Sequence, residues 1–208
     1  MNTTQATPAE PAHALGETLS TERLSIRPAS LEDEASTWQF RRLDDVNDWL
    51  TGTPDTAEGY HELFRDPIRL STTVIVELNS DHGGKVIGDF MFRIEDAWAQ
   101  LDVAEQAQGR QVELGWVLDP HFTGHGYATE AVRELIRYGF ENLGVHRIVA
   151  DCFLDNEASW RLMERVGMRR EKHAVRDSFH RSGGWMDTVA YAILDDEYPR
   201  PSTKEQHQ

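Results

Sequence analysis

The segment DPHFTGHGYATEA, residues 119–131, joins two stretches of different periodicity. Before it, QVELGWVLD (111–119) is rich in apolar and β-branched residues, which predicts a strand. After it, apolar residues recur from Tyr127 to Asn142 at the spacing of an amphipathic helix. The segment is therefore predicted to be a strand-to-helix turn, and its glycines and histidines need an explanation.

The start of the predicted helix has the properties of an anion-binding site. The first backbone N–H groups of a helix have no acceptor within the helix, and the helix dipole adds partial positive charge there. Gly124 and Gly126 lack Cβ atoms, so an anion can approach the backbone closely. Such a turn suits a phosphate or pyrophosphate. A simple turn and one half of a metal site are the alternatives.

Two other phosphate-binding motifs fit this turn less well. A P-loop has Lys followed by Ser or Thr after its last glycine, whereas Tyr127 and Ala128 follow here. The dinucleotide fingerprint G-x-G-x-x-G needs a third glycine, and Thr129 stands in its place.

His121 and His125 have a spacing that zinc ligands on a helix can have. Pro120 and Gly124 argue against a helix over this span, and no acidic or cysteine cluster accompanies the histidines. We therefore expect no metal site.

The rest of the chain predicts a mixed α/β fold. Strands are expected at 24–28, 72–78, 85–94, 111–119 and 146–153, followed by two strands around 181–184; helices are expected from Ser30, at 55–65, 127–142 and 156–166. Ser30 and Asp33 form a predicted capping pair, and residues 95–110 are expected to be a loop. This order implies a mixed sheet with helices on its faces.

Composition narrows the class of protein. At 208 residues we expect one domain over 21–198, with disordered tails at 1–20 and 199–208. The net charge of −15 argues against nucleic acid and anionic membrane partners and favours cationic ones, although acidity can also serve solubility alone. Cys152 is the one cysteine, and neither a signal peptide nor a membrane span is recognisable, so the expected location is the cytoplasm.

Several separated segments together resemble the GCN5-related N-acetyltransferase (GNAT) superfamily, in particular its Rim-type branch. They are TERLSIRPAS (21–30), VELGWVLDPHFTGHGYATEAV (112–132), DNEASWRLMERVGM (155–168) and WMDTVAYAIL (185–194). The second contains the acetyl-CoA motif Q/R-x-x-G-x-G/A, aligned with Thr123 to Ala128. The resemblance covers roughly residues 20 to 198 and implies a mixed sheet of about seven strands with helices on both faces.

The resemblance also implies a cofactor site for acetyl-CoA. In this family two parallel strands, here 112–118 and 147–153, splay apart beside the pantetheine arm. The backbone of residues 124 to 128 would bind the pyrophosphate, and Asn156 would bond the pantetheine or cap its own helix. The implied cofactor-binding residues are Trp116, Val117, Leu118, Thr123, Gly124, His125, Gly126, Tyr127, Ala128 and Asn156.

The catalytic residues follow from the same resemblance, with departures. Thr123 replaces Gln or Arg of the motif, and Met168 replaces a phenylalanine. Met163 stands where many members carry a tyrosine that acts as the general acid. A serine at the Ser159 position is the proton donor proposed in the Rim-type branch, and a first-turn role in its helix is the alternative. Glu113 is the first candidate for the base, and an exposed strand residue is its alternative reading. The other candidates for the base are Asp151, His146 and Glu95.

The function implied is transfer of the acetyl group of acetyl-CoA to a primary amine by direct attack in a ternary complex. The acceptor would be a protein N-terminus or a small cationic amine, and the enzyme a monomer or homodimer. A non-catalytic acyl-CoA-binding regulator on the same fold is the alternative. Trp38, Trp49, Phe40 and Tyr60 belong to helices that wall the acceptor site in this family, but we expect them to be core residues.

Overall fold

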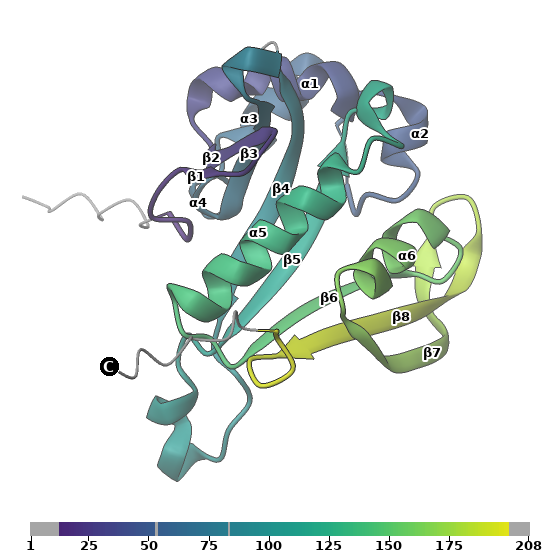
Figure 1. The fold of residues 1–208 in the computed structure, drawn as a ribbon. Coiled ribbons are helices and arrows are strands. Elements are labelled where there is room, and N and C mark those ends of the chain that lie inside the picture. The colour runs from purple at the N-terminus through teal and green to yellow at the C-terminus, as the bar shows by residue number, and fades with distance from the viewer. Residues whose placement is uncertain (1–12, 53, 83, 200–208) are drawn as a thin grey trace, which may run out of the picture. The chain divides into compact units, whose positions relative to one another are not determined.

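The computed structural model describes residues 13–52, 54–82 and 84–199 (Figure 1). Contacts divide the chain into two compact units. The first unit comprises residues up to 93 together with 115–131, and the second comprises 94–114 together with the residues from 132 onward. Strands β4 (Val86–Glu95) and β5 (Gln111–Leu118) and helix α5 (Tyr127–Glu141) each contribute residues to both units.

Four strands of the first unit pair in chain order. They are β1 (Leu19–Ser20), β2 (Leu24–Pro28), β3 (Thr73–Leu78) and β4, and every neighbouring pair is antiparallel. Val74, Ile75 and Val76 are fully buried, so β3 is covered on both faces, as its run of β-branched residues predicts. The register between β3 and β4 shifts at Val76/Glu77, which marks a β-bulge.

The first unit also holds most of the short helices. They are η1 (Leu31–Asp33), α1 (Glu34–Arg41), α2 (Asp44–Asn47), α3 (Ala57–Phe64), α4 (Pro67–Thr72), η2 (Ser80–His82) and η4 (Pro120–Phe122). The predicted capping pair is present, because the Ser30 backbone N–H donates to Asp33 Oδ2 at 2.8 Å. The Tyr60 hydroxyl donates to Thr37 Oγ1 at 2.8 Å between α3 and α1, and both residues are buried.

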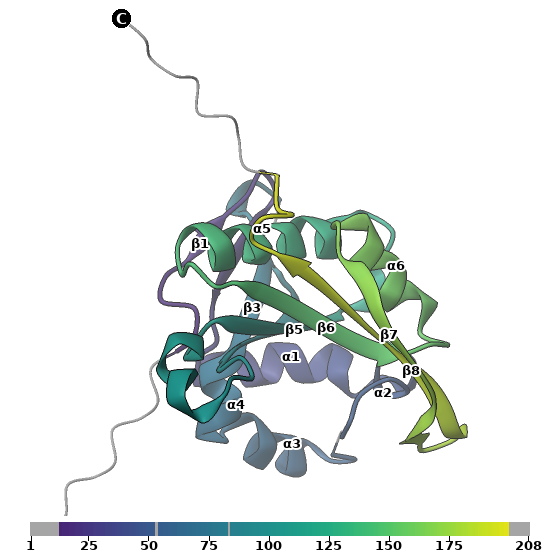
Figure 2. The same ribbon diagram turned by 90° about the horizontal axis from the view of Figure 1, so that it is seen from below.

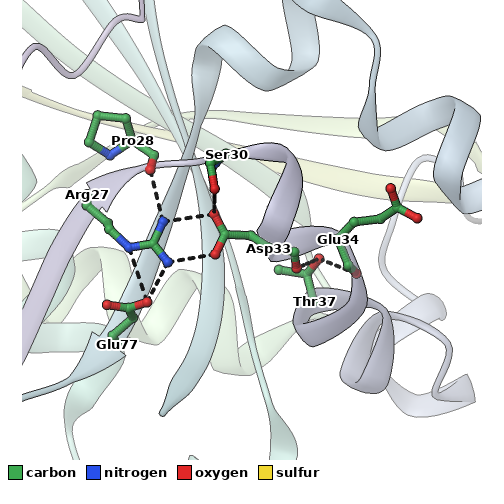
Figure 3. Close-up of polar contacts among 7 residues, drawn as sticks. All are labelled: Arg27, Pro28, Ser30, Asp33, Glu34, Thr37 and Glu77. Carbon is green, nitrogen blue, oxygen red and sulfur yellow. Dashed lines mark hydrogen bonds and ion pairs between the residues drawn. The ribbon is translucent and has the colours of Figure 1, made fainter. Parts of the chain in front are cut away.

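Arg27 on β2 joins this capped helix start to the sheet (Figure 3). Its guanidinium donates to both carboxylate oxygens of Asp33, at 2.8 and 2.6 Å, and to Glu77 on β3. Burial raises the pKa of the Asp33 carboxyl, but the hydrogen bonds from Arg27 and Ser30 outweigh burial, so the net pKa lies below its ordinary value. This network holds β2, β3 and η1 together.

The second unit is built on a hairpin and two further strands. Figure 2 shows β6 (Arg147–Phe153), β8 (Gly184–Leu194) and β7 (Arg169–His180) side by side. β6 pairs with β8 along its whole length, whereas its parallel register with β5 comprises only the three pairs from Gln111↔Arg147 to Glu113↔Val149. Helix α6 (Glu157–Arg165) packs against β6, β7 and β8. The parallel β5–β6 pair and the antiparallel pairs confirm a mixed sheet.

A projecting arm precedes β5 in the second unit. Residues 95–110 were expected to be an irregular loop, but they contain η3 (Leu101–Ala107). The arm is closed by the Ala97 N–H to Ala107 carbonyl bond of 2.9 Å. Trp98 and Leu101 are 91% and 97% exposed, so two large apolar side chains stand in solvent on a hydrogen-bonded arm.

The structure corrects the expected start of the ordered chain. Within the predicted tail 1–20, the described residues include β1, and Leu15 and Leu19 are buried. The ring Nε2 of His13 lies 2.6 Å from the Thr73 carbonyl oxygen. The described chain contains eight strands, where about seven were expected. Disorder expected for 1–12 and 200–208 lies outside the described residues, and a single acetyltransferase domain remains a prediction.

Candidate functional site

The turn between β5 and α5 has a defined backbone in the first unit. Asp119, which is buried, accepts the His121 backbone N–H at 3.0 Å and lies 2.7 Å from its Nδ1. The Thr123 hydroxyl donates to the Pro120 carbonyl at 2.8 Å. Gly124 and Gly126 then have φ values of +79° and +82°, which side chains disfavour. The two glycines are therefore required by the backbone path.

The glycine turn presents a row of backbone donors. Helix α5 starts at Tyr127, and the Glu130 N–H donates to the Gly126 carbonyl at 3.0 Å. Within the described residues, no acceptor is found for the backbone N–H groups of the five residues from 124 to 128. Residues 123–126 are exposed. Successive free N–H groups at the start of a long helix are what a bound phosphate group requires.

An arginine and a glutamate that the sequence analysis overlooked hold this turn. Arg23 donates from Nε to Glu130 Oε2 at 2.7 Å and from Nη1 to the His125 carbonyl at 3.0 Å. Its guanidinium carbon lies 4.6 Å from the centre of the Tyr127 ring. Glu130 also accepts the Thr21 hydroxyl at 2.6 Å. In the sequence, Glu130 shows only as an acidic residue of a first helical turn, which is common.

Glu130 is expected to be negatively charged, as its contacts with Arg23 require. Burial raises the pKa of its carboxyl, but the hydrogen bonds from Thr21 and Arg23 outweigh burial, so the net pKa lies below its ordinary value. Thr21 and Arg23, which precede β2, therefore hold the Glu130 carboxylate in its charged form.

The end of β5 belongs to the same unit as the turn. Val117 is buried, whereas Trp116 and Leu118 are half-buried. A Cβ on Gly88 of β4 would lie 2.7 Å from the Val117 carbonyl oxygen, so a glycine is needed for the two strands to approach so closely. The structure thus brings together nine of the ten expected cofactor residues; Asn156 lies in the second unit.

Asn156 and Ser159 lie at the start of α6 in the second unit. Asn156 is the N-cap, and its Oδ1 accepts the Ser159 backbone N–H at 3.2 Å. The capping role considered for Asn156 is therefore present. The cap uses the side-chain oxygen, and the amide nitrogen of the same side chain is a separate hydrogen-bond donor. Both residues are half-buried.

The candidates for the base also lie in the second unit, in different settings. Glu113 is half-buried and pairs in register with Val149. Asp151 is exposed. His146 is exposed, with Nδ1 at 3.1 Å from Asp195 Oδ1. Glu95 accepts the Gln111 side-chain amide at 3.3 Å.

Two side chains bear on the alternatives to a direct mechanism. Met163, at the place of the family's acidic tyrosine, is 1% exposed in α6. Burial raises the pKa of the Cys152 thiol to about 12, with a further contribution from Asp151. The thiol is therefore protonated at neutral pH, which makes it a poor nucleophile.

The aromatic residues of the first helices are divided between core and surface. Phe40 and Tyr60 are each 1% exposed and belong to the core, whereas Trp38 and Trp49 are half-buried. Trp38 stacks on Tyr60 with ring centres 5.0 Å apart. Among the described residues, no cluster of three or more His, Cys, Asp or Glu could hold a metal ion. None of the described helices has the length and apolar character to cross a membrane.

A family model matches most of the chain. Residues 23–169 match the acetyltransferase (GNAT) domain, and this range includes the turn, Asn156 and Ser159. The protein p20 of Bacillus licheniformis, an uncharacterized N-acetyltransferase, is 29% identical over 88% of this chain and 98% of its own. YnaD of Bacillus subtilis, also an uncharacterized N-acetyltransferase, is 40% identical over 41% of this chain, and the match spans 50% of YnaD.

The solved structures agree on the fold. A GNAT-family acetyltransferase from Bacillus anthracis superposes with a TM-score of 0.72 at 27% identity, covering 86% of this chain and 99% of that one. Sequence matches over part of the chain include the uS5-alanine N-acetyltransferase of Escherichia coli, which is 31% identical over 41% of this chain and 43% of that protein. Another is the spermidine N(1)-acetyltransferase of Vibrio cholerae, 27% identical over 43% of this chain and 51% of that protein.

Proposed function

Because the chain belongs to the GNAT acetyltransferase family, we propose that it transfers the acetyl group of acetyl-CoA to a primary amine. The observation that carries the donor is the row of free N–H groups from residue 124 to 128. A pyrophosphate needs several donors at once, and charge-assisted hydrogen bonds from backbone N–H groups are short and strong. Thr123 adds no positive charge to the turn, so the backbone N–H groups are the donors that support this ligand.

The reaction we propose is a direct attack. The amine nitrogen forms a bond to the thioester carbonyl carbon while the carbon–sulfur bond breaks. Backbone donors beside the carbonyl oxygen would stabilise the negative charge that develops on it. The raised pKa of Cys152 supports a mechanism without an acyl-enzyme intermediate on that thiol.

Proton transfers are assigned to Glu113 and Ser159. An ammonium must lose a proton before it can attack, and a carboxylate with restricted access to water is a suitable acceptor. The partial burial of Glu113 favours it over the exposed Asp151. Ser159 would donate its hydroxyl proton to the leaving thiolate and regain a proton from the attacking nitrogen, which must lose one to become a neutral amide. Asn156 would donate its amide N–H to the pantetheine.

Two classes of acceptor fit the chain. The net charge of −15 favours a cationic acceptor over an anionic one. The relatives named above include an enzyme named for a ribosomal-protein alanine and one named for spermidine. A protein N-terminus and a small polyamine are therefore the acceptors to test first.

The test is a binding measurement followed by a turnover screen. Isothermal titration should show acetyl-CoA binding, and a thiol-release assay should show CoA release with at least one amine from a panel of N-terminal peptides, polyamines and aminoglycosides. Glu113→Gln should lower the rate about 100-fold or more while keeping the affinity for CoA, because only the general base is removed. Normal turnover of this variant across the pH range would remove Glu113 as the base.

The non-catalytic regulator predicts a different pattern. It would bind acetyl-CoA and release no thiol with any amine of the panel. The replacement of the acidic tyrosine by buried Met163 is the observation that keeps this second function in view. Absence of acetyl-CoA binding would exclude both functions.

A further inference from the structure

We propose that Arg23 is a positioning residue for the turn at 123–128, which it orients for the pyrophosphate of acetyl-CoA. This inference rests on the proposed function and adds to it a residue outside the acetyl-CoA motif. Arg23 immediately precedes β2 and is 107 positions from Glu130, with which it forms an ion pair of 2.6 Å. Its contacts with the turn act on two separate features, one peptide unit and one carboxylate.

The first feature is the peptide between His125 and Gly126. Arg23 Nη1 donates to the His125 carbonyl oxygen at 3.0 Å. The C=O and N–H of a trans peptide point in opposite directions from the same plane. Anchoring this carbonyl on Arg23 therefore turns the Gly126 N–H away from the arginine. The direction of one of the free donors is set by a side chain from another part of the first unit.

The second feature is the negative charge in the first turn of α5. Glu130 would repel a pyrophosphate at the helix start, and its oxygens could accept the N–H groups that the ligand needs. Instead, Oε2 accepts the Arg23 side chain, and Oε1 accepts the Thr21 hydroxyl at 2.6 Å and the Arg23 backbone N–H at 3.0 Å. The carboxylate is thus neutralised and kept from the turn.

The shape of the guanidinium matters for both features. One planar fork bonds the carboxylate and the carbonyl while its face lies over the Tyr127 ring. A lysine ammonium could neutralise Glu130, but it could not hold the carbonyl and the carboxylate in the same fixed geometry. The Arg23→Lys variant therefore keeps the positive charge beside Glu130 but loses the fixed orientation of the His125 carbonyl.

Arg27 provides a matched control on β2, the strand that Arg23 immediately precedes. It too is a partly exposed arginine with carboxylate partners, Asp33 and Glu77 (Figure 3). Among the described residues, its hydrogen bonds go to these carboxylates and to the Pro28 carbonyl, and none of these groups belongs to the turn. Arg27→Gln should destabilise the fold at least as much as Arg23→Gln, because Asp33 is the more buried carboxylate. Only the Arg23 variant should impair the pyrophosphate site.

The experiment is a titration of CoA and of dephospho-CoA, which keeps the pyrophosphate, into the full-length protein and its variants, with the Tm of each. Arg23→Gln should weaken both ligands about tenfold, since it removes a bond to a carbonyl and exposes a carboxylate. Arg23→Lys should lose less, and Arg27→Gln should stay within about twofold of the wild type. Adding Glu130→Gln to Arg23→Gln should restore part of the affinity without restoring the Tm.

Each outcome decides the matter. Equal loss of affinity in the Arg23 and Arg27 variants would mean that Arg23 acts only through stability. No rescue by Glu130→Gln would overturn the part of the inference that concerns the Glu130 charge. A loss for CoA but none for dephospho-CoA would assign Arg23 to the 3′-phosphate and overturn the inference. If the wild type binds neither ligand, the proposed function itself has failed; if it binds both and Arg23→Gln binds them equally well, only the role of Arg23 has failed.

Discussion

Helices α5 and α6 both begin after a strand, but they begin in opposite ways. At α6, Asn156 accepts the Ser159 N–H with its side chain and its carbonyl, and its carbonyl also accepts the Trp160 N–H. At α5, two glycines with positive φ lead into the helix, and no side chain of the described residues caps the N–H groups of residues 124 to 128. The start of α6 thus has a side-chain cap of its own, whereas the start of α5 leaves a row of backbone N–H groups that we propose a ligand accepts.

This difference between the two helix starts is the reason for proposing the ligand site at α5 and not at α6. An uncapped helix start is less stable than a capped one, because its first N–H groups bond to water and not to a fixed side chain. Around α5 the surrounding chain reinforces this state instead of relieving it, since Arg23 and Thr21 hold the Glu130 carboxylate that could have served as a cap. The variants below change one start or the other, in order of decreasing effect.

The largest effect is expected at Gly126. Gly126→Val should weaken CoA binding about 100-fold, because a β-branched residue is excluded from its φ of +82° and the donors on either side would be redirected. Gly144→Val is the matched control, since Gly144 has a φ of +63° and open space around its Cβ direction. Isothermal titration and thermal unfolding should show similar losses of Tm for both and a loss of affinity only for Gly126→Val. Similar affinities in both would reduce the turn to a structural element.

The next effect concerns the capped start of α6. Asn156→Ala should lower the free energy of unfolding by about 1 kcal/mol, whereas Asn156→Ser should nearly retain it, because serine is also a good cap. Both variants lack the amide N–H proposed for the pantetheine, so both should weaken CoA binding by about threefold to tenfold. Denaturant unfolding and titration measure the two quantities separately. Unchanged CoA affinity in both variants would leave Asn156 with its capping role alone.

A smaller gain is expected at Thr123. Thr123→Arg should tighten CoA binding by about threefold to fivefold, because a cation near a bound phosphate at an exposed site contributes modestly. The gain should shrink as salt is raised, because salt screens exposed charges. Titration at two salt concentrations measures it. An affinity unaffected by the substitution would place Thr123 away from the phosphates.

The smallest effect on turnover is expected at Cys152, whose sulfur lies 4.0 Å from the Asn156 carbonyl. Cys152→Ala should leave the turnover rate unchanged. The folded pKa of about 12 exceeds the ordinary value of 9.0, so the neutral thiol favours folding below pH 9, and this contribution is lost as the pH rises toward 12. The difference in stability between wild type and variant should therefore depend on pH only in this alkaline range. A rate loss in the variant would reopen covalent catalysis.

Local patterns were sufficient for the elements that carry the site. The apolar run before Asp119, the two glycines and the helical spacing after Tyr127 predicted β5, the turn and α5, and the structure has all three. Short elements were missed, because α4 is only six residues long and β1 only two. Their residues become ordered through tertiary contacts, such as that of His13 with the Thr73 carbonyl.

Long-range polar pairs lay beyond the reach of the sequence. Nothing in TERLSIRPAS indicates that Arg23 reaches α5 whereas Arg27 reaches Asp33 and Glu77. Arg23 is followed by Leu24 and Arg27 is preceded by Ile26, and these local sequences do not indicate which carboxylate each arginine meets. The same holds for Asn156, since a single asparagine before a helix predicts a cap and a ligand contact equally well.

The exposed arm at 95–110 carries an intrinsic fluorescent probe. Trp98 is 91% exposed, so its indole should emit at long wavelength and be quenched readily by iodide. A Trp98→Phe difference spectrum isolates this signal from the other tryptophans. Any molecule that covers the arm would shift the emission to the blue, and the protein would thus report its own contacts at this place without a label.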